Sequence, residues 1–213
     1  MYKAIIFDLD GVVVSTDNCH YEAWKQLADE EGIYFDRTIN ERLRGVSRME
    51  SLEIVLEKAE KEYSNDEKLE MAERKNGYYK EKIKLLDTSA ILDGALEFIN
   101  KAKETGLKVA IGSSSKNTIA ILNQVKCIEL FDAIADGNDI QNSKPAPDVF
   151  LVAAEKLGIA PEECMVVEDA DAGVEAALAA NMDVLAVGYA SANPKATYSA
   201  KGLFDTPAKA ILG

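Results

Sequence analysis

Short apolar runs alternate with amphipathic helical patterns along most of this chain of 213 residues. Five runs are predicted to be buried strands, at 3–9, 107–113, 131–135, 164–168 and 183–188. Helical patterns lie between them at 94–105, 116–125, 146–157 and 171–181. Gly106, Gly158 and Asn181 stand where three of these helices would end. This alternation predicts an α/β fold, with a parallel sheet covered by helices on both faces.

Residues 18–86 differ, because they contain no convincing strand. Helical patterns run through 18–31, about 38–44, 48–62 and 66–86. The block follows the first strand, so it would interrupt the α/β domain rather than precede or follow it. We predict a four-helix domain over 16–89 and a discontinuous α/β domain over 1–15 and 90–213.

The formal net charge of −13 makes nucleic acid and anionic membranes poor partners for this chain. The three cysteines, Cys19, Cys127 and Cys164, lie far apart and form no CxxC motif, which favours a reduced cytosolic protein. We find no secretory signal and no apolar stretch long enough to span a membrane. We therefore expect a cytoplasmic monomer. An anionic substrate would need local positive charge or a metal ion.

Polar side chains follow several of the predicted strands, at the edge where open parallel sheets bind ligands. Asp8 and Asp10 follow the first strand, residues 113–117 follow the second, and Glu168 and Asp169 follow the fourth, while Lys144 lies in a loop. Converging carboxylates would repel one another, and a divalent cation removes that repulsion. Oxygen ligands suit Mg²⁺, which often bridges to a phosphate. Hydroxyls, loop N–H groups and Lys144 could hold that phosphate.

This arrangement predicts phosphoryl transfer. One carboxylate can attack phosphorus, and a second one two residues later can act as general acid and base. Asp8 and Asp10 have the spacing that places both on one side of an extended strand. Each motif alone has a simpler explanation as a turn, a helix cap or a surface lysine. The ordered combination at four positions favours a functional site.

The segments FDLDGVV, GSSSKN, SKPAPD and VVEDADAG resemble the four motifs of the haloacid dehalogenase superfamily. The resemblance implies a Rossmann-like core with a helical cap, bound Mg²⁺ and an aspartyl-phosphate intermediate. It implies that Asp8 is the nucleophile and Asp10 the acid and base. It further implies that Ser113 and Lys144 stabilise the phosphate. The implied metal ligands are Asp8, the backbone carbonyl of Asp10, Glu168 and Asp169.

The segments DNCHYEAW, LRGVSRMES and ERKNGYY resemble cap segments of the β-phosphoglucomutase family. That resemblance implies interconversion of β-D-glucose 1-phosphate and glucose 6-phosphate through β-glucose 1,6-bisphosphate, with a phosphorylated hexose as the partner. His20 and Trp24 would face the sugar, and Arg48 would grip the distal phosphate. The implied substrate-binding residues are His20, Trp24, Gly45, Val46, Ser47, Arg48, Ser51, Lys75 and Asn76 in the cap, and Ser115, Lys116 and Asn117 in the core.

Other interpretations stay open at this point. His20 and Trp24 are four residues apart, so they could pack inside the cap instead, and Lys75 could be a solvated lysine. A sugar-phosphate phosphatase would use the same four motifs, and a non-catalytic binding protein could keep the fold. Ser15 stands where the family commonly has an aspartate. We expect Asp171 to cap the helix that follows it, and family analogy implies a cis Lys144–Pro145 bond.

Overall fold

The computed structural model describes residues 2–206, which divide into two compact units. One unit is Thr16–Leu86, and the other consists of the chain before Thr16 and after Leu86. Within the described residues, no helix has both the length and the apolar character needed to cross a bilayer.

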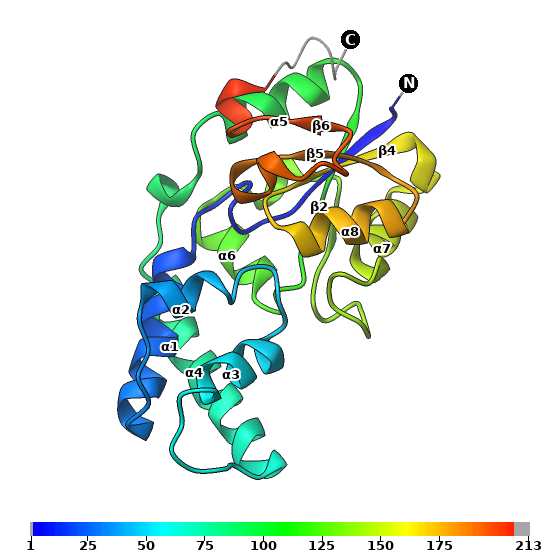
Figure 1. The fold of residues 1–213 in the computed structure, drawn as a ribbon. Helices are drawn as coiled ribbons and strands as arrows, with labels where there is room; N and C mark the ends of the chain where they lie inside the picture. Colours follow the sequence, from blue (N-terminus) through cyan, green and yellow to red (C-terminus); the bar gives the residue numbers. More distant parts are fainter. Residues whose placement is uncertain (1, 207–213) are drawn as a thin grey trace. The chain divides into compact units, whose positions relative to one another are not determined.

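The larger unit is built on a six-stranded sheet in which every neighbouring pair is parallel. The strand order is β3-β2-β1-β4-β5-β6, and Figure 1 labels β2, β4, β5 and β6 of this sheet. The strands are β1 (Ala4–Phe7), β2 (Lys108–Gly112), β3 (Ala133–Ala135), β4 (Cys164–Glu168), β5 (Asp183–Ala186) and β6 (Tyr198–Ser199). Each predicted run contains one strand, and β6 is the strand that the sequence did not predict, because two residues carry no detectable pattern.

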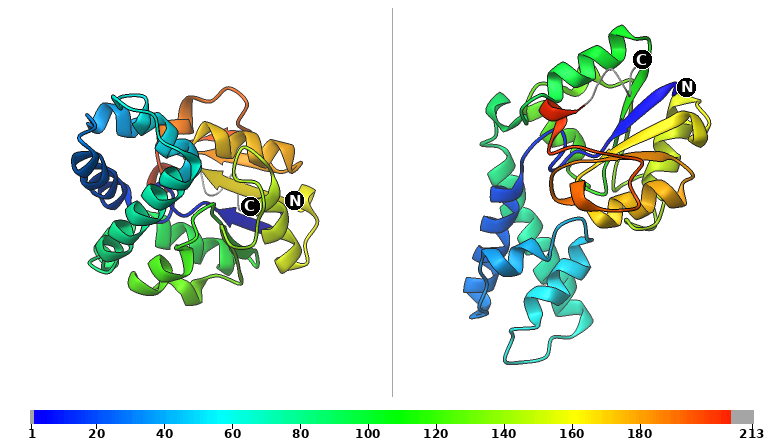
Figure 2. Two further views of the ribbon diagram at one scale, coloured as in Figure 1. Left: turned by 90° about the horizontal axis from the view of Figure 1, so that it is seen from below. Right: turned by 45° about the horizontal axis from the view of Figure 1, so that its top comes forward.

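Helices cover both faces of this sheet, as Figure 2 shows from two further directions. Successive residues of a strand point to opposite faces. Ile6 packs with Phe150 and Val174 of α7 and α8, whereas the ring of Phe7 meets that of Phe98 of α5 edge-on at 6.1 Å. The helices are α5 (Ala95–Glu104), α6 (Thr118–Gln124), α7 (Asp148–Leu157) and α8 (Asp171–Ala179). Single 3-10 turns occur at η1 (Thr88–Ala90), η2 (Ile128–Leu130), η3 (Pro161–Glu163), η4 (Gly188–Ala192) and η5 (Leu203–Asp205).

The smaller unit is entirely helical. It contains α1 (Asp17–Glu31), α2 (Arg37–Glu41), α3 (Arg48–Leu56) and α4 (Asn65–Ile83). Helices α1 and α4 run antiparallel, because Lys82 pairs with Glu22 near one end and Arg74 pairs with Glu31 near the other. Their apolar faces form a core with α3 that includes Trp24, Leu27, Leu52, Val55 and Met71.

Capping residues explain where α3 and α4 begin. Ser47 and Glu50 form a reciprocal capping box at the start of α3, and Ser64 and Glu67 form another at the start of α4. Each box satisfies backbone N–H groups that the first turn of a helix leaves unpaired. The sequence prediction ran α3 on to residue 62, six residues beyond its observed end at Leu56. The intervening segment forms a loop instead.

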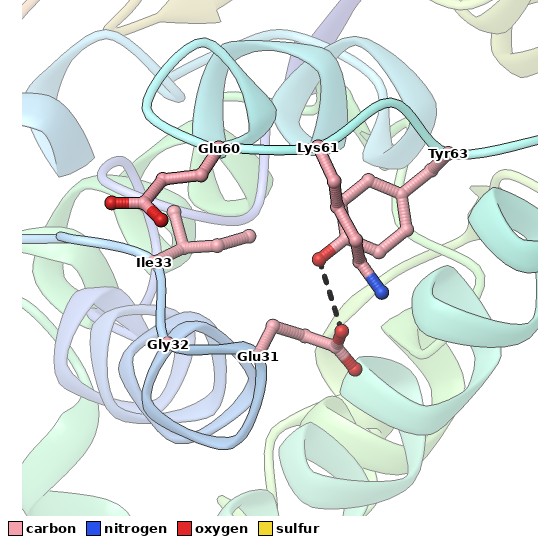
Figure 3. A pocket seen from close by; sticks show the side chains of 6 residues that line it. All are labelled: Glu31, Gly32, Ile33, Glu60, Lys61 and Tyr63. Atoms are coloured by element: carbon pink, nitrogen blue, oxygen red, sulfur yellow. Dashed lines mark hydrogen bonds between the residues drawn. The ribbon is translucent and has the colours of Figure 1, made fainter.

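A pocket lies in the smaller unit between the end of α1 and this loop (Figure 3). The hydroxyl of Tyr63 donates to Glu31 at 3.0 Å across it, and Arg74 also pairs with Glu31. The ammonium of Lys61 lies 4.5 Å from the ring of Tyr63. None of the predicted site residues lines the pocket, whose lining is Glu31, Gly32, Ile33, Glu60, Lys61 and Tyr63.

Two chain segments connect the sheet to the helical residues, and they pair with each other. Val14 forms an antiparallel bridge with Ile91, and the N–H of Ser15 donates to Ala90 at 2.8 Å. The peptide bond between Lys144 and Pro145 is cis, as family analogy implied.

Candidate active site

The register of the central strands places the predicted core residues at one edge of the sheet. Phe7 of β1 lies opposite Ile111 of β2 and opposite Val167 of β4. The next residue on β1 is Asp8, whose N–H donates to the carbonyl of Val167 at 2.9 Å. Asp8 therefore lies between the end of β2 and Glu168 at the end of β4.

Three carboxylates meet at this edge. Oxygen atoms of Asp8, Glu168 and Asp169 all lie within 4.8 Å of one another, and the three residues are 7%, 1% and 7% exposed. The sequence predicted that four carboxylates would converge. The carboxylate of Asp10 lies outside this group of three, and Asp10 is half-buried.

The side chain of Lys144 joins two of the carboxylates. Its Nζ donates to Asp8 Oδ1 at 2.5 Å and to Glu168 Oε2 at 2.7 Å, and it lies 4.7 Å from the ring of Phe150. Burial alone would lower the pKa of this lysine, but the two carboxylates outweigh burial and raise it. Lys144 is therefore a buried ammonium and not a surface lysine.

One ammonium does not balance three buried carboxylates. Burial raises the pKa of Asp8 to about 7. The negative charges of Glu168 and Asp10 also raise this pKa, whereas the positive charge of Lys144 lowers it. Burial and the neighbouring charges of Glu168 and Asp8 raise the pKa of Asp169 to about 9. A divalent cation would relieve this repulsion, and a donor set made only of oxygen fits Mg²⁺. The residues present therefore fit the predicted metal.

Two glycines make room for the acidic side chains. A Cβ atom at Gly11 would lie 2.0 Å from Asp169 Oδ2, and the φ angle of Gly11 is +82°. A Cβ atom at Gly173 would lie 2.0 Å from Glu168 Oε2. Both glycines lie within the motifs FDLDGVV and VVEDADAG, but their function depends on contacts between distant segments.

Both oxygens of Glu168 are engaged. Oε1 accepts from the N–H groups of Asp169 and Ala170, at 3.0 and 3.1 Å, and Oε2 accepts from Lys144. Glu168 thus accepts from backbone N–H groups just before α8, whereas we expected Asp171 to cap this helix. Asp171 is instead the first residue of α8, and its carboxylate accepts from Asn193 at 2.7 Å.

The loop at residues 113–117 folds upon its own hydroxyl groups. Ser113 Oγ accepts from the N–H of Ser115, and Ser115 Oγ accepts from the N–H of Asn117, both at 3.2 Å. We expected loop N–H groups near the start of the helix to help hold a phosphate, and two N–H groups of this loop instead donate to its own hydroxyl groups. Each hydroxyl keeps its own hydrogen as a donor. Helix α6 begins at Thr118, later than the predicted start at 116. Ser113 and Asn117 are buried, whereas Lys116 is exposed.

In the helical unit, the predicted residues His20 and Lys75 are in contact. Lys75 is 3% exposed, and its Nζ lies 3.1 Å from His20 Nδ1. The same ammonium lies 4.6 Å from the ring of Trp24 and 4.9 Å from that of Tyr79. Burial, together with the positive charges of Lys75, Arg48 and Arg44, lowers the pKa of His20. His20 is therefore a neutral acceptor, and Lys75 is not a solvated lysine.

Other predicted cap residues have structural partners. Trp24 is 1% exposed within the helical core, so its ring packs there and supports Lys75 rather than lying on a surface. Ser47 caps α3, and Ser51 is buried.

Arg48 is the other predicted cationic residue of the helical unit. It donates to Asn76 Oδ1 at 3.0 Å and pairs with Glu73 at 3.5 Å. In the preceding segment, Gly45 is exposed with a φ angle of +71°, and Val46 is half-buried.

Sequence reasoning missed several residues that support the site. Phe150 faces Lys144, Tyr79 faces Lys75, and Arg44 forms a two-pronged ion pair with Asp17 at 2.7 and 2.6 Å. The position of Arg44 beside the Gly45–Arg48 segment was a signal that could have found it. Phe150 and Tyr79 gave no comparable signal, because a buried aromatic residue is most often core.

Comparison with known proteins supports a single family. Residues 2–181 match the haloacid dehalogenase-like hydrolase family model. A β-phosphoglucomutase of Bacillus subtilis is 43% identical over 188 residues, covering 87% of this chain and 83% of that protein. A phosphorylated carbohydrates phosphatase of Thermotoga maritima is 31% identical, covering 85% of this chain and 82% of that protein. The crystal structure of a β-phosphoglucomutase from Clostridium difficile superposes with a TM-score of 0.88 at 41% identity, covering 96% of this chain and 92% of that one.

Proposed function

The chain belongs to the haloacid dehalogenase-like hydrolase family, and from this premise we propose that it is a phosphosugar mutase. The proposed reaction interconverts β-D-glucose 1-phosphate and glucose 6-phosphate through β-glucose 1,6-bisphosphate. The observation that supports a mutase in particular is the 43% identity to the Bacillus subtilis β-phosphoglucomutase over most of both chains. The cluster of Asp8, Lys144 and the acidic pair supports phosphoryl transfer as the chemistry.

The proposed roles in the core follow from the contacts of each side chain. Asp8 is the nucleophile, because its carboxylate stands at a strand end in contact with an ammonium. Lys144 and Ser113 stabilise the oxygens of the transferring phosphoryl group. Mg²⁺ would be held by Asp8, Asp169, Glu168 and the backbone carbonyl of Asp10, and would neutralise charge on the phosphoryl group. Since both oxygens of Glu168 already accept hydrogen bonds, its main part here is to position Lys144.

Two chemical steps complete the proposed reaction. In the first, a substrate hydroxyl attacks the phosphoryl group on Asp8. A phosphorus–oxygen bond forms to the sugar, the bond to Asp8 breaks, and Asp10 accepts the hydroxyl proton. In the second, Asp8 attacks the other phosphoryl group of the bisphosphate. That sugar–phosphate bond breaks, and Asp10 returns its proton to the leaving oxygen, so Asp8 is again phosphorylated.

The helical unit supplies the proposed sugar and distal-phosphate contacts. Arg48 is the proposed partner of the distal phosphate, because a guanidinium can bind a phosphate in a bidentate manner. Because Nδ1 of the neutral His20 imidazole accepts from Lys75, its Nε2–H is a donor, and this N–H and the ammonium of Lys75 both offer donors to sugar hydroxyls. The remaining proposed substrate contacts are Gly45, Val46, Ser47, Ser51 and Asn76 in this unit, and Ser115, Lys116 and Asn117 in the core.

A sugar-phosphate phosphatase is the second candidate. The observation in its favour is the 31% identity to the phosphorylated carbohydrates phosphatase of Thermotoga maritima. The same residues would form the phosphorylated Asp8, and water would then take the place of the sugar hydroxyl.

Anomer selectivity tests the proposal. The enzyme is supplied with β- or α-glucose 1-phosphate, Mg²⁺ and a trace of bisphosphate, and glucose 6-phosphate is measured with a coupled dehydrogenase. We expect turnover of the β anomer and none with Asp8→Asn. Activity confined to the α anomer, or Asp8→Asn activity equal to that of the wild type, would contradict the mutase proposal.

A further inference from the structure

The turn at residues 136–139, which follows β3, is held by a dense set of hydrogen bonds. Asp136 accepts from the N–H of Asn138 at 2.8 Å and from Asn138 Nδ2 at 3.3 Å, while its own N–H donates to Asp139 at 2.9 Å. Lys156 of α7 donates to Asp139 and to the carbonyl of Ile134, both at 2.7 Å. Lys156 thereby fixes the 136–139 turn to α7.

This turn contacts the 113–117 loop directly. The N–H of Gly137 donates to the carbonyl of Ser115 at 3.1 Å, and Asn138 Nδ2 donates to the carbonyl of Lys116 at 3.3 Å. The loop that carries Ser113 is therefore supported from one side by a turn that the proposed reaction does not use.

Gly137 is buried at the closest point of this contact. A Cβ atom there would lie 2.3 Å from the carbonyl oxygen of Ser114 and 3.0 Å from the N of Lys116. The oxygen and the nitrogen belong to the backbone, which cannot swing aside as the tip of a flexible side chain can. Any side chain at this position must therefore displace the 113–117 loop or the 136–139 turn.

We propose that Gly137 is a positioning residue, and that through it the 136–139 turn holds the 113–117 loop in the conformation that receives the phosphoryl group. The inference rests on the proposed function, because it takes this loop as the one that binds phosphate. Ser113 and Ser115 orient their hydroxyl groups through bonds within the same loop, so a displaced loop would misplace both donors.

Calorimetric titration with inorganic phosphate at saturating Mg²⁺ tests the inference on the full chain. We expect Gly137→Ala to weaken phosphate binding about fivefold or more, since losing one ordinary hydrogen bond changes an equilibrium constant by about that factor. The matched control is Gly77→Ala, because an added Cβ atom at Gly77 has nothing within 4 Å. Partial unfolding would lower the number of sites, whereas loss of positioning lowers the affinity at unchanged stoichiometry.

A second pair of variants covers the case in which Gly137→Ala does not fold. Asn138→Ala removes an exposed side chain and its bond to Lys116, and we expect phosphate binding to weaken measurably, by up to about fivefold. Asn123→Ala is its control, because Asn123 donates to Ile119 within α6 at 2.9 Å, away from the turn.

The possible results separate the two proposals. Unchanged affinity in Asn138→Ala and in folded Gly137→Ala overturns the positioning role, while the proposed function stands. A wild-type chain that binds no phosphate overturns the proposed function itself.

Discussion

At the scale of single residues, the absence of a side chain at Gly11 decides where Asp169 can lie. Gly11→Ala would place a methyl group 2.0 Å from the Asp169 carboxylate and strain a φ angle of +82°. We expect the Mg²⁺ concentration for half-maximal activity to rise about tenfold or more, as displaced metal-site side chains commonly cause. The measurement is a Mg²⁺ titration of activity at saturating substrate.

Gly32→Ala is the matched control for this change. Gly32 ends α1 with a φ angle of +70°, but an added Cβ atom there has nothing within 4 Å. The control carries similar backbone strain, of about 1 kcal/mol, without a collision. An equal shift of the Mg²⁺ midpoint in both variants would mean that strain, and not the contact with Asp169, is responsible.

Glu168 gives a second prediction at this scale. Glu168→Gln keeps the shape of the side chain but removes one of the two negative charges that hold Lys144. We expect kcat to fall about 10- to 100-fold, the usual cost of losing a group that orients a catalytic side chain. Asp171→Asn is the control, since Asp171 pairs with Asn193 at the surface. Comparable losses in both variants would contradict the role given to Glu168.

The sequence was informative about residues whose chemistry follows from their position at a strand end. Asp8, Glu168 and Asp169 could be chosen because carboxylates rarely follow buried strands without a reason, and Lys144 because its segment SKPAPD resembles a family motif. The contacts of Gly173 and Phe150 could not be chosen in this way. Their effects arise where separate segments meet, and a single sequence does not record such distances.

At the scale of secondary-structure elements, a half-buried ion pair links α1 and α4. Glu31 accepts from Arg74 and from the hydroxyl of Tyr63, and these hydrogen bonds lower the pKa of Glu31 below its usual value. A carboxyl with a lowered pKa stabilises the folded state above its unfolded pKa. That stabilisation is lost as the pH falls through the lowered folded pKa.

We therefore expect the free energy of unfolding to fall by about 1 kcal/mol more in the wild type than in Glu31→Gln when the pH is lowered from about 6 to below the folded pKa of Glu31. Trp24 is the single tryptophan and lies in the helical core, so its fluorescence during urea unfolding reports on this unit. Glu60→Gln, on the other side of the pocket in Figure 3, controls for removing a charge. Parallel pH profiles for wild type and Glu31→Gln would rule out this contribution.

Elements were easier to predict than their ends. The five apolar runs all contain strands, because burial on both faces of a parallel sheet requires continuous apolar residues. Helix α3 was predicted too long, since charged residues after Leu56 continue a helical pattern without a marked stop. The capping box of Ser47 and Glu50 was visible as SRME, yet Ser47 was assigned to substrate alone.

At the scale of the whole molecule, the chain joins a sheet-based unit and a helical unit within one sequence. The charge of −13 and the buried carboxylates make an anionic substrate unexpected until Lys144 and a fitting metal site are considered. The helical unit carries its own positive groups, Arg48 and Lys75. We propose that Lys144 and the metal serve one phosphate of a hexose bisphosphate, that Arg48 serves the other, and that Lys75 contacts sugar hydroxyls.

We propose that a sugar hydroxyl, and not water, takes the phosphoryl group from Asp8. Phosphorus NMR can follow one mixture of enzyme, Mg²⁺, β-glucose 1-phosphate and a trace of β-glucose 1,6-bisphosphate, and so measure glucose 6-phosphate and inorganic phosphate together. We expect glucose 6-phosphate to be the main product and inorganic phosphate to be a minor one. Release of inorganic phosphate at a rate equal to or above that of glucose 6-phosphate formation would contradict it.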